Sequence, residues 1–584
     1  MKPYSFDGAQ IYIPGPYVAT LFPENPVQQE PGPRTTAIIG SGFGGIPYNA
    51  SAEGITDQMK SNEMSSSPQA KNYIIGGDAY YGAEFFFTPS KNPAYRAPSR
   101  LLYFRVDPAT QSTAKTRNTG DTADILDHTS GRYGIQSTLL SKKIEAGSVS
   151  GYKVSVNFKG DKILVKDNVG YNFLDIQYIG AGSAATMDIT GTGLTTTVTG
   201  APTDNLSILF ATVKTLGELV SLINEHTAYS CSLKNDSDLS SNYLDIVAGQ
   251  DILTAAYTAT ADTQAVIDTL NLETRGEVIT ALSTGATRES LKLDTGFVPF
   301  TGGTDGVISN NDWSGALTLM EKFDIDTIVV LSGNSTIHQL VSNHCFEMSK
   351  TKVGKKRNWY SGGLKTDTFQ EKLDAAVALN DARGTYQLSK FSRNDVLSGT
   401  VQDFHPFFGA AIFAGLRNAN NLTMSITFKD VNIISTDEYD PDQEENIIKS
   451  GASYLKRVGS SYEVGHHIST FQGRNLIFRL PSMLETTDFM AKDTSRVLRE
   501  RMKQYDRAPN DLMIKEAENY FNTIHFPGYR DNGLITNNPN NPEERAFTPV
   551  TIEVVGEVFR IRTTLLVVSP QHYGFASLEF TTIG

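Results

Sequence analysis

Apolar residues in much of the chain follow two patterns, one typical of buried strands and one typical of helices. TTAIIG from Thr35 and LLYFRVDP from Leu101 are short continuous apolar runs, which predict buried strands. Further along, the predicted elements are a strand at Ile325–Leu331, helices from about Ser335, at 367–380 and around 406–417, and a strand at Thr385–Phe391. Strands that alternate with helices predict an α/β layer fold here.

The segment between residues 111 and 300 has a different pattern. Thr, Ser, Asn and Asp dominate it, and 21 of the 120 residues from 181 to 300 are Thr. Short β-type runs such as KILVKD and LSILFATV are separated by Gly and Asn, with one helical patch over Leu216–Ile223. The pattern predicts an inserted β-rich region with a solvated face.

Both ends of the chain are expected to be extended. Six prolines among residues 14–33 exclude a helix, whereas Gln10–Ile13 fits a short strand. Residues 490–525 have the spacing of two amphipathic helices, the second opened by Pro509. From Val550 the apolar period becomes two, and the run FASLEFTT follows. The sequence therefore predicts an α+β and α/β multi-domain protein with strand-like arms at both ends.

Length and charge narrow the possible functions. A chain of 584 residues exceeds the roughly 250–300 residues at which a single hydrophobic core stops growing, so several domains are expected. The net charge of -13 argues against a nucleic-acid partner, because such proteins need a basic face. Residues 181–300 carry five Lys and Arg against fourteen Asp and Glu, a net charge of -9. Most of the acidity therefore lies in the predicted insertion.

Targeting signals and disulfides are not expected. Cys231 and Cys345 give neither a disulfide framework nor a zinc pattern, which favours assembly in a reducing cytosol. The N-terminus has no continuous apolar segment of the export-signal type, and nowhere do about 18 apolar residues run together. We therefore expect no membrane insertion.

One motif resembles a cofactor site. Gly40-Ser-Gly-Phe-Gly-Gly45 is a formal GxGxxG after the TTAII run, as in dinucleotide-binding proteins. Such a site needs a helix that begins at the third glycine, so that its N–H groups face the pyrophosphate. Pro47 and a polar stretch without helical periodicity follow instead. The sequence thus favours a structural turn.

Two histidine-containing pairs and one basic cluster could also carry chemistry. His344-Cys345 falls on the apolar side of a predicted helix, which favours a packed core pair over a metal or thiol site. His466-His467 lies in an apparent strand, where neighbouring side chains point to opposite faces.

The basic cluster lies beside two aromatic residues. Lys352, Lys355, Lys356 and Arg357 precede Trp359 and Tyr360, and in an acidic chain they favour a solvated loop or a docking patch for an acidic partner. No other catalytic motif is present in the sequence. We expect no enzyme activity and no cofactor.

Several segments, in this order, resemble the contractile phage tail sheath family. AIIGSGFGGIPYN is similar to the family's strand and glycine turn, and LLYFRVD to the strand that closes this portion. GGTDG at 302–306 resembles the element where the chain re-enters the core after a variable insertion. Further similar segments are the Ala/Gly-rich helix from Pro406, SITFK, VGHHISTF, the paired helices and IEVVGEVFRIRTTLLVV. The resemblance covers about 1–110 and 300–584.

The resemblance implies a structural subunit of a myophage tail sheath. Such a sheath polymerises helically around the tail tube and contracts to drive the tube through the host envelope, which leads to genome ejection. The implied partners are other copies of the chain, the tail tube protein, and baseplate and tail terminator proteins. The implied location is the virion, after assembly in the host cytoplasm.

In this family, terminal arms add strands to the sheets of neighbouring subunits. The residues expected to act as inter-subunit arms are Ile11, Tyr12, Ile13, Tyr17, Val18, Phe575, Leu578 and Phe580. The expected domains are an N-terminal arm (1–34), the first part of the sheath core (35–110), an outward-facing β-rich insertion (111–300), the α/β part of the core (301–430), a C-terminal domain with two helices (431–549) and a C-terminal hairpin and arm (550–584).

Three alternatives stay open at this point. The chain could belong to the sheath of a bacterial contractile injection system. A nucleotide-binding oxidoreductase would require a helix directly after the glycine turn. A static tail-tube or capsid-decoration protein would not need donated arms at both ends.

Overall fold

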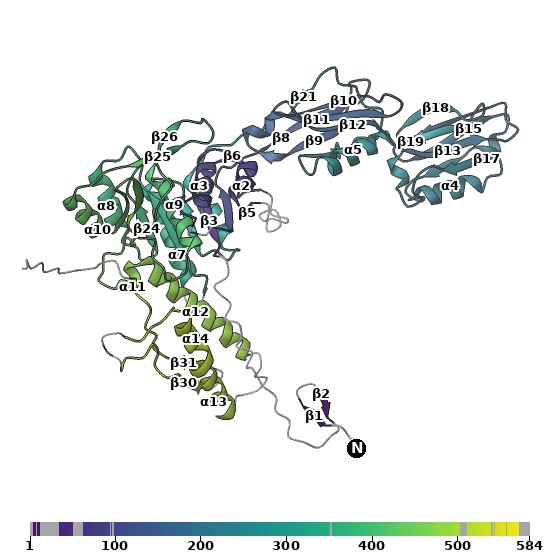
Figure 1. Cartoon of the computed structure of the whole chain (residues 1–584). Helices are drawn as coiled ribbons and strands as arrows, with labels where there is room; N and C mark the ends of the chain where they lie inside the picture. Colours follow the sequence, from purple (N-terminus) through teal and green to yellow (C-terminus); the bar gives the residue numbers. More distant parts are fainter. Residues whose placement is uncertain are drawn as a thin grey trace, which may run out of the picture.

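The computed structural model places the chain in three main parts (Figure 1). A core body built on one large sheet lies in the middle, two β-rich lobes extend from it to one side, and a C-terminal unit of helices and a hairpin lies below. The structure describes residues 4–6, 9–11, 34–50, 62–93, 95, 98–350, 353–502, 511–538, 541, 543–555 and 558–570.

The core body contains an eight-stranded sheet in the order β29-β28-β24-β23-β22-β3-β7-β5. Its strands are β3 (Thr36–Gly40), β5 (Glu63–Met64), β7 (Leu101–Arg105), β22 (Thr327–Val330), β23 (Asn358–Gly362), β24 (Gly384–Gln387), β28 (Ala452–Val458) and β29 (Ser461–His466). The six strands from β28 to β7 are parallel, and β29 and β5 are antiparallel to their neighbours. β3 and β7 are buried along their whole length, as expected for strands covered on both faces.

Helices cover both faces of this sheet. The helices are α2 (Ser67–Tyr73), α3 (Asp78–Phe87), α6 (Asn310–Met320), α7 (Ser335–Ser349), α8 (Phe369–Leu379), α9 (Pro406–Ala419) and α10 (Pro441–Ser450). Ile38 of β3 packs with α3 and α9, whereas Ala37 and Ile39 pack with α6 and α7. Successive strand side chains point to opposite faces, so one apolar strand contributes to two cores. Gly415 lets α9 approach α3 closely, because a Cβ there would lie 2.3 Å from the carbonyl oxygen of Phe86.

Most of the predicted core elements are confirmed, and one is wrong. The predicted strand at 385–391 is divided, because β24 ends at Gln387 and β25 (Phe391–Asn394) joins β26 (Val401–Phe404) and β27 (Ser435–Thr436) in another sheet. The bend is fixed at Ser389, whose carbonyl accepts from Gln387 Nε2 at 2.8 Å and whose hydroxyl accepts from Leu455 N at 3.0 Å.

The central sheet also extends past residue 430. β28 begins at Ala452 and pairs with β24 through Tyr386 and Gln387. The eight-stranded sheet therefore crosses the boundary expected between residues 430 and 431.

The chain leaves the central sheet after β7 and returns to it at β22, and it forms two lobes in between. The first lobe contains β8 (Gln111–Arg117), β9 (Asp124–Tyr133), β10 (Leu140–Ala146), β11 (Tyr152–Phe158), β12 (Asp161–Val169), α5 (Asp262–Glu273), β20 (Val278–Leu282) and β21 (Val298–Pro299). The second contains β13 (Asn172–Tyr178), β14 (Ala184–Ile189), β15 (Gly193–Thr199), β16 (Ser207–Leu209), α4 (Leu216–Asn224), β17 (Tyr229–Leu233), β18 (Val247–Asp251) and β19 (Tyr257–Thr260). Each lobe has its own apolar core, so each is a separate packing unit. α4 confirms the predicted helical patch.

A buried arginine joins the first lobe to the core body. Arg105 at the end of β7 is fully buried and its Nε lies 3.0 Å from Asp107, while Nη2 lies 2.8 Å from Asp305. Its Nη1 also donates to the carbonyl oxygens of Gly45 and Tyr133. One side chain therefore holds the glycine turn, the lobe and the two segments that connect the lobe to the core body. Asp305, on the returning segment, is the acidic residue of the GGTDG element.

The C-terminal unit combines helices with a hairpin. It contains α11 (Leu476–Arg479), α12 (Pro481–Met502), α13 (Asp511–Tyr520), a π-helical turn (Phe521–His525), α14 (Phe526–Asp531), β30 (Thr551–Val555) and β31 (Val558–Arg562). The two predicted helices are confirmed, but the first begins earlier, at Pro481, and the second continues to Asp531. The predicted hairpin is confirmed as well. Pro509 and the FASLEFTT run lie outside the described residues.

Two further findings concern the described part of the chain alone. None of its helices is long and apolar enough to cross a membrane. Within the same residues, no group of three or more His, Cys, Asp and Glu side chains could hold a metal ion.

Candidate assembly site

The arm residues expected from the sequence are only partly within the described residues. Ile11 is the last residue of β2 (Ala9–Ile11), which pairs with β1 (Tyr4–Phe6) in a two-stranded sheet. The other seven, Tyr12, Ile13, Tyr17, Val18, Phe575, Leu578 and Phe580, lie outside the described residues. Their role in assembly stays a prediction, and the sites that the structure does define are the points where the two terminal segments join the body.

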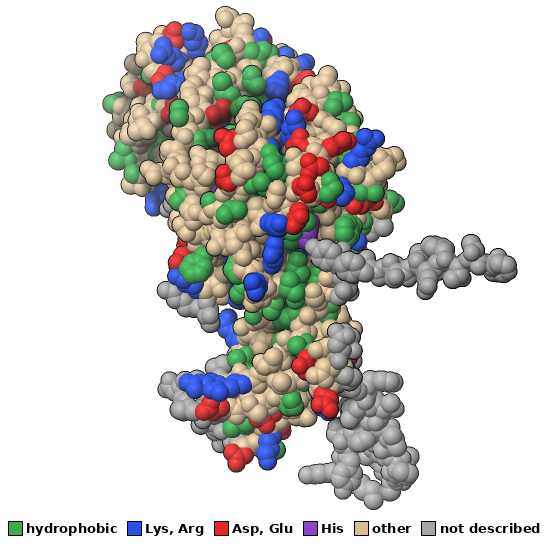
Figure 2. Space-filling view, turned by 90° about the vertical axis from the view of Figure 1, so that its left-hand side faces the viewer, with side chains coloured by type: hydrophobic (Ala, Val, Ile, Leu, Met, Phe, Trp, Pro, Cys, Tyr) green, Lys and Arg blue, Asp and Glu red, His purple; other side chains and the backbone are tan. Residues whose placement is uncertain are grey.

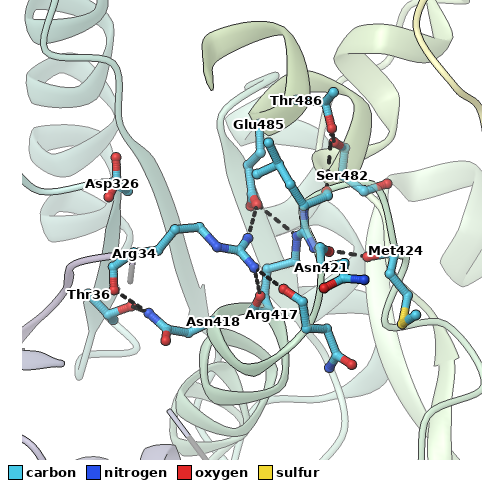
Figure 3. A network of polar contacts seen from close by, with 12 residues as sticks. Arg34, Thr36, Asp326, Arg417, Asn418, Asn421, Met424, Ser482, Glu485 and Thr486 are labelled. Carbon is cyan, nitrogen blue, oxygen red and sulfur yellow. Dashed lines mark hydrogen bonds and ion pairs between the residues drawn. The ribbon is translucent and has the colours of Figure 1, made fainter. Parts of the chain in front are cut away.

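The N-terminal segment enters the core body through a buried ion-pair network (Figure 3). Arg34, directly before β3, donates from Nη1 to Glu485 Oε2 of α12 at 2.9 Å. Its Nη2 donates to the carbonyl oxygens of Arg417 and Asn420 at the end of α9. Glu485 is only 7% exposed, so its charge is almost completely removed from water. One arginine thus joins the start of the sheet to α9 and to α12.

A second arginine completes the same network. Arg417 of α9 is 1% exposed, and its Nε lies 2.7 Å from Glu485 Oε2. Its Nη1 donates to the carbonyl oxygens of Asn421 at 3.0 Å and Met424 at 2.9 Å. The neighbouring Asn418 donates to the carbonyl oxygen of Arg34 at 2.6 Å. The carboxylate of Glu485 therefore balances two guanidinium groups, and backbone carbonyls satisfy most of their remaining donors.

Burial changes the acidity of the first arginine. Desolvation, together with the positive charge of Arg417, lowers the pKa of Arg34 to about 10, while Glu485 opposes this shift. Arg34 therefore stays charged at neutral pH and keeps its ion pair. The consequence is a fixed exit point for residues 1–33, at the joint between the core body and the C-terminal unit.

No pattern in the sequence singles out these residues. Arg34 and Glu485 are 451 positions apart, and each is an ordinary charged residue at the border of an apolar segment. The only local signal is that Arg34 directly precedes the buried strand. A charge at the start of a buried run needs a partner, but the sequence does not reveal which one.

The joint between the core body and the C-terminal unit has an apolar surface. Figure 2 shows the larger body above and the smaller unit below, linked by a narrower region where hydrophobic side chains gather. On α11, Leu476 and Phe478 are 55% and 41% exposed. Val567, close to the last described residue Pro570, and Ile477 of the same helix both pack against a small buried cluster of Ile468, Leu480 and Met483. The C-terminal segment thus leaves the body beside exposed apolar side chains.

The hairpin of the C-terminal unit has two edges that differ. Ile552 of β30 lies opposite Ile561 of β31, and Ile552 N donates to Glu518 Oε1 of α13 at 2.8 Å. In an antiparallel pair, two opposite residues either exchange backbone hydrogen bonds or both direct their N–H and C=O groups away from the partner strand. Because the N–H of Ile552 is directed to α13, this is a pair of the second kind. The backbone groups of Ile561 therefore point to the outer side of β31. Within the described residues, no strand pairs with that side.

The glycine turn is filled by the protein's own groups. β4 (Phe43–Gly44) lies within the Gly40–Gly45 motif and pairs with β6 (Ile74–Gly76), so no helix begins there. The N–H of Gly42 donates to Asp107 at 3.0 Å, where a dinucleotide would need a phosphate. A Cβ on Gly40 would lie 2.8 Å from Leu331 Cβ. The turn therefore serves packing, and the oxidoreductase alternative loses the feature on which it depended.

Two histidine pairs are part of the packed interior. His344 and Cys345 are both buried in α7, which confirms the predicted core pair. His344 Nε2 accepts from Arg357 at 2.6 Å, and burial lowers the pKa of His344 to about 4 and raises that of Cys345. His466 ends β29, and the ring of His467 stacks on Tyr360 at 5.7 Å between centroids.

The basic cluster, expected to be a solvated loop or a docking patch, divides into a buried arginine and two partly exposed lysines, Lys355 and Lys356, while Lys352 lies outside the described residues. Arg357 is fully buried and donates to the carbonyl oxygens of Met320 and Phe323. Trp359 and Tyr360 are fully buried in β23. Arg357 lies where α6 ends against the sheet, so it stabilises a helix terminus and takes no part in a surface patch, whereas the role of the three lysines stays a prediction.

The fold is that of sheath tail proteins. The structure of a sheath tail protein from Desulfitobacterium hafniense aligns with 95% of this chain and 100% of its own chain, with a TM-score of 0.52 and 13% sequence identity. A sheath tail protein from Listeria innocua aligns with 91% of this chain and 95% of its own, with a TM-score of 0.51 and 12% identity. The chain thus shares the fold of these sheath tail proteins.

The amino-acid sequence is also similar to that of a phage tail sheath protein. The tail sheath protein of Bacillus phage SP01 is 24% identical over 524 residues, which span 85% of this chain and 84% of that protein. No family model matches the chain. The shared fold and the similarity to a phage tail sheath protein along most of both chains support the contractile tail sheath family, in agreement with the resemblance expected from the sequence.

Proposed function

We propose that this chain is the repeating subunit of a contractile tail sheath and that its terminal segments link the subunits by strand donation. The observation that carries the proposal is the open outer edge of β31 in a chain whose two terminal segments leave the body near the same joint. An open edge is a template for pairing with another chain, and a specific donated strand turns it into an assembly site.

The terminal segments have the length that this role needs. Residues 1–33 precede Arg34 and residues 571–584 follow Pro570. At about 3.3 Å per residue, the first segment can span roughly 100 Å when extended, and the second roughly 45 Å. Both distances exceed the diameter of a small domain, about 30 Å, so either segment can reach a neighbouring subunit.

Strand donation gives a tether of moderate strength. A six-residue strand adds about six backbone hydrogen bonds, each contributing roughly 0.5–1.5 kcal/mol before ordering costs. Repeated through a head-to-tail interface that does not close, such contacts produce a helical polymer. The tethers can persist while the bodies rotate and repack, which would let an extended sheath contract without falling apart. The buried Arg34 network supports this role, because it fixes the root of the N-terminal tether.

The two lobes are proposed to face outward from the polymer. The second lobe carries two Lys against nine Asp and Glu within residues 171–261, a net charge of -7. Identical acidic lobes repel one another, so their natural position is the periphery, where the subunits are farthest apart. The core body and the C-terminal unit would then lie nearer the tube.

The sheath role brings further proposed partners. A sheath subunit requires a tail tube inside the polymer, with baseplate and terminator proteins at its ends, and a location in the virion after assembly in the host cytoplasm. A sheath in a bacterial contractile injection system uses the same kind of subunit, and similarity to a phage protein favours the phage setting.

Deletion of the terminal segments tests the proposal. Chains without residues 1–20 or without 570–584 are expected to remain folded monomers, because the described cores lie outside both segments. Circular dichroism and size-exclusion chromatography check the fold, and electron microscopy checks for striated tubes. The full-length chain should form tubes and neither truncated chain should. Normal tubes from either truncation would contradict the proposal.

A further inference from the structure

Asparagine side chains close the edges of three sheets in the described part of the chain. Val550, directly before β30, donates its N–H to Asn522 Oδ1 at 2.7 Å, and Asn522 Nδ2 donates to the carbonyl oxygen of Val550 at 3.4 Å. One amide side chain therefore binds both backbone groups of a single residue. Glu518 accepts from Ile552 two positions further along the same edge.

The same arrangement recurs in the first lobe. Thr280 of the edge strand β20 donates its N–H to Asn271 Oδ1 at 2.7 Å, and Asn271 Nδ2 donates to the carbonyl oxygen of Thr280 at 2.9 Å. Asn271 belongs to α5, which packs beside β20.

The second lobe has a third example. Cys231 of the edge strand β17 has both backbone groups bonded to Asn224 of α4, each at 2.8 Å. In all three cases the amide comes from the helix, or helical turn, that flanks the edge. Three unrelated sheets thus use one residue type at one geometrical position.

The chemistry of the amide explains this choice. A strand that joins an edge offers an N–H donor and a C=O acceptor to each outward-pointing residue. The Asn side chain offers the same pair of groups, NH2 and C=O. It therefore occupies the place of a neighbouring strand, and an arriving strand would have to displace it and leave polar groups without partners. A capped edge is closed to strand addition.

The outer edge of β31 differs from these capped edges. The outward-pointing backbone groups of Ile561 and Thr563 receive no side-chain amide or carboxylate within the described residues. Further along, Val567 is already paired with Ile535. The outer side of β31 is thus open at Ile561 and Thr563, while Asn522 and Glu518 cover the other side of the hairpin at Val550 and at the N–H of Ile552.

We propose that Asn522 and Glu518 are specificity-determining residues that direct the donated strand to β31 by closing the outer edge of β30 at Val550 and Ile552, and that Asn224 and Asn271 close the edges of β17 and β20 to the same strand. This inference rests on the proposed strand donation. Beyond strand donation itself, it states which strand of the hairpin accepts the donated strand and which side chains of the accepting subunit decide this.

Disulfide trapping in the full chain tests the choice of edge. Arg560 of β31 and Glu553 of β30 lie opposite each other and are both about half exposed, so Arg560→Cys and Glu553→Cys form a matched pair. Each is combined in turn with a second cysteine within residues 9–13 or 575–580. The native Cys231 and Cys345 are buried and do not compete. After mild oxidation of assembled tubes, a ladder of linked subunits on a non-reducing gel reports strand contact.

We expect Arg560→Cys to give at least about tenfold more linked subunits than Glu553→Cys. A factor of about ten corresponds to the free energy of roughly one backbone hydrogen bond that a strand gains at the open edge and does not gain at the capped one. In an Asn522→Ala, Glu518→Ala background, Glu553→Cys should gain linkage. Equal linkage at the two positions in the native background, within normal tubes, would overturn the choice of edge and leave strand donation intact. The absence of tubes from the full-length chain would instead refute the proposed function and this inference with it.

Discussion

Removal of the Glu485 carboxylate perturbs the root of the N-terminal segment most directly. Glu485→Ala leaves the buried guanidinium groups of Arg34 and Arg417 without a counter-charge. Breaking a buried ion pair by removing one partner costs roughly 3–5 kcal/mol, because the remaining charge stays buried and uncompensated. Both arginines keep carbonyl acceptors, Arg34 at Asn420 and Arg417 at Met424. We therefore expect a loss of about 3 kcal/mol, at the lower end of that range.

Tryptophan fluorescence in urea measures this loss. The chain has two tryptophans, Trp313 and Trp359, and both are buried in the core body. With a denaturant dependence of about 3 kcal/mol per molar urea, a loss of about 3 kcal/mol lowers the midpoint by about 1 M. Glu445→Ala is the matched control, because Glu445 pairs with Lys449 on an exposed helix surface, where water and salt screen the ion pair and its loss changes stability little.

The comparison between the two variants decides the outcome. Equal midpoints for Glu485→Ala and Glu445→Ala would refute the reasoning that the junction is a buried, mutually dependent network. A lower urea midpoint in Glu485→Ala alone would support the reasoning, as would faster proteolytic removal of residues 1–33 in that variant.

Two further predictions follow from burial and from charge. Burial lowers the pKa of His338 in the folded protein to about 4, whereas the pKa of this histidine in the unfolded chain is about 6.5. Between these two pH values the unfolded chain binds a proton that the folded protein does not. The free energy of unfolding should therefore decrease as the pH falls from about 6.5 to 4, with a lower urea midpoint at pH 5 than at pH 7, and His338→Gln should reduce that difference; an unchanged difference would contradict this assignment. Limited proteolysis of assembled sheath should cleave within 111–300 first, for example near Val149, which is 87% exposed. Complete protection of that segment would rule out the outward placement of the lobes.

Local pattern was sufficient for many elements of the core body. The apolar runs that form β3, β7 and β22 indicate strands covered on both faces, and the helical spacing of α7 gives that helix one apolar side, whereas α9 is buried all round from Pro406 to Arg417. The helix α5 was not predicted, because its buried side includes polar residues such as Thr263, Gln264 and Thr269, so its apolar residues do not form a clear helical pattern. Periodicity detects apolar burial, and it does not detect buried polar side chains that find partners.

The sequence by itself determined the fold class, the strand-like character of the hairpin and, through ordered similarity, the sheath family. Tertiary structure alone decided which charges meet and which sheet edges stay open. Arg34 finds Glu485 across 451 positions, and Asn522 finds Val550 only because the π-helical turn folds against the hairpin. Local periodicity follows from the geometry of helix and strand, whereas ion pairs and edge caps require segments distant in sequence to be brought within hydrogen-bonding distance.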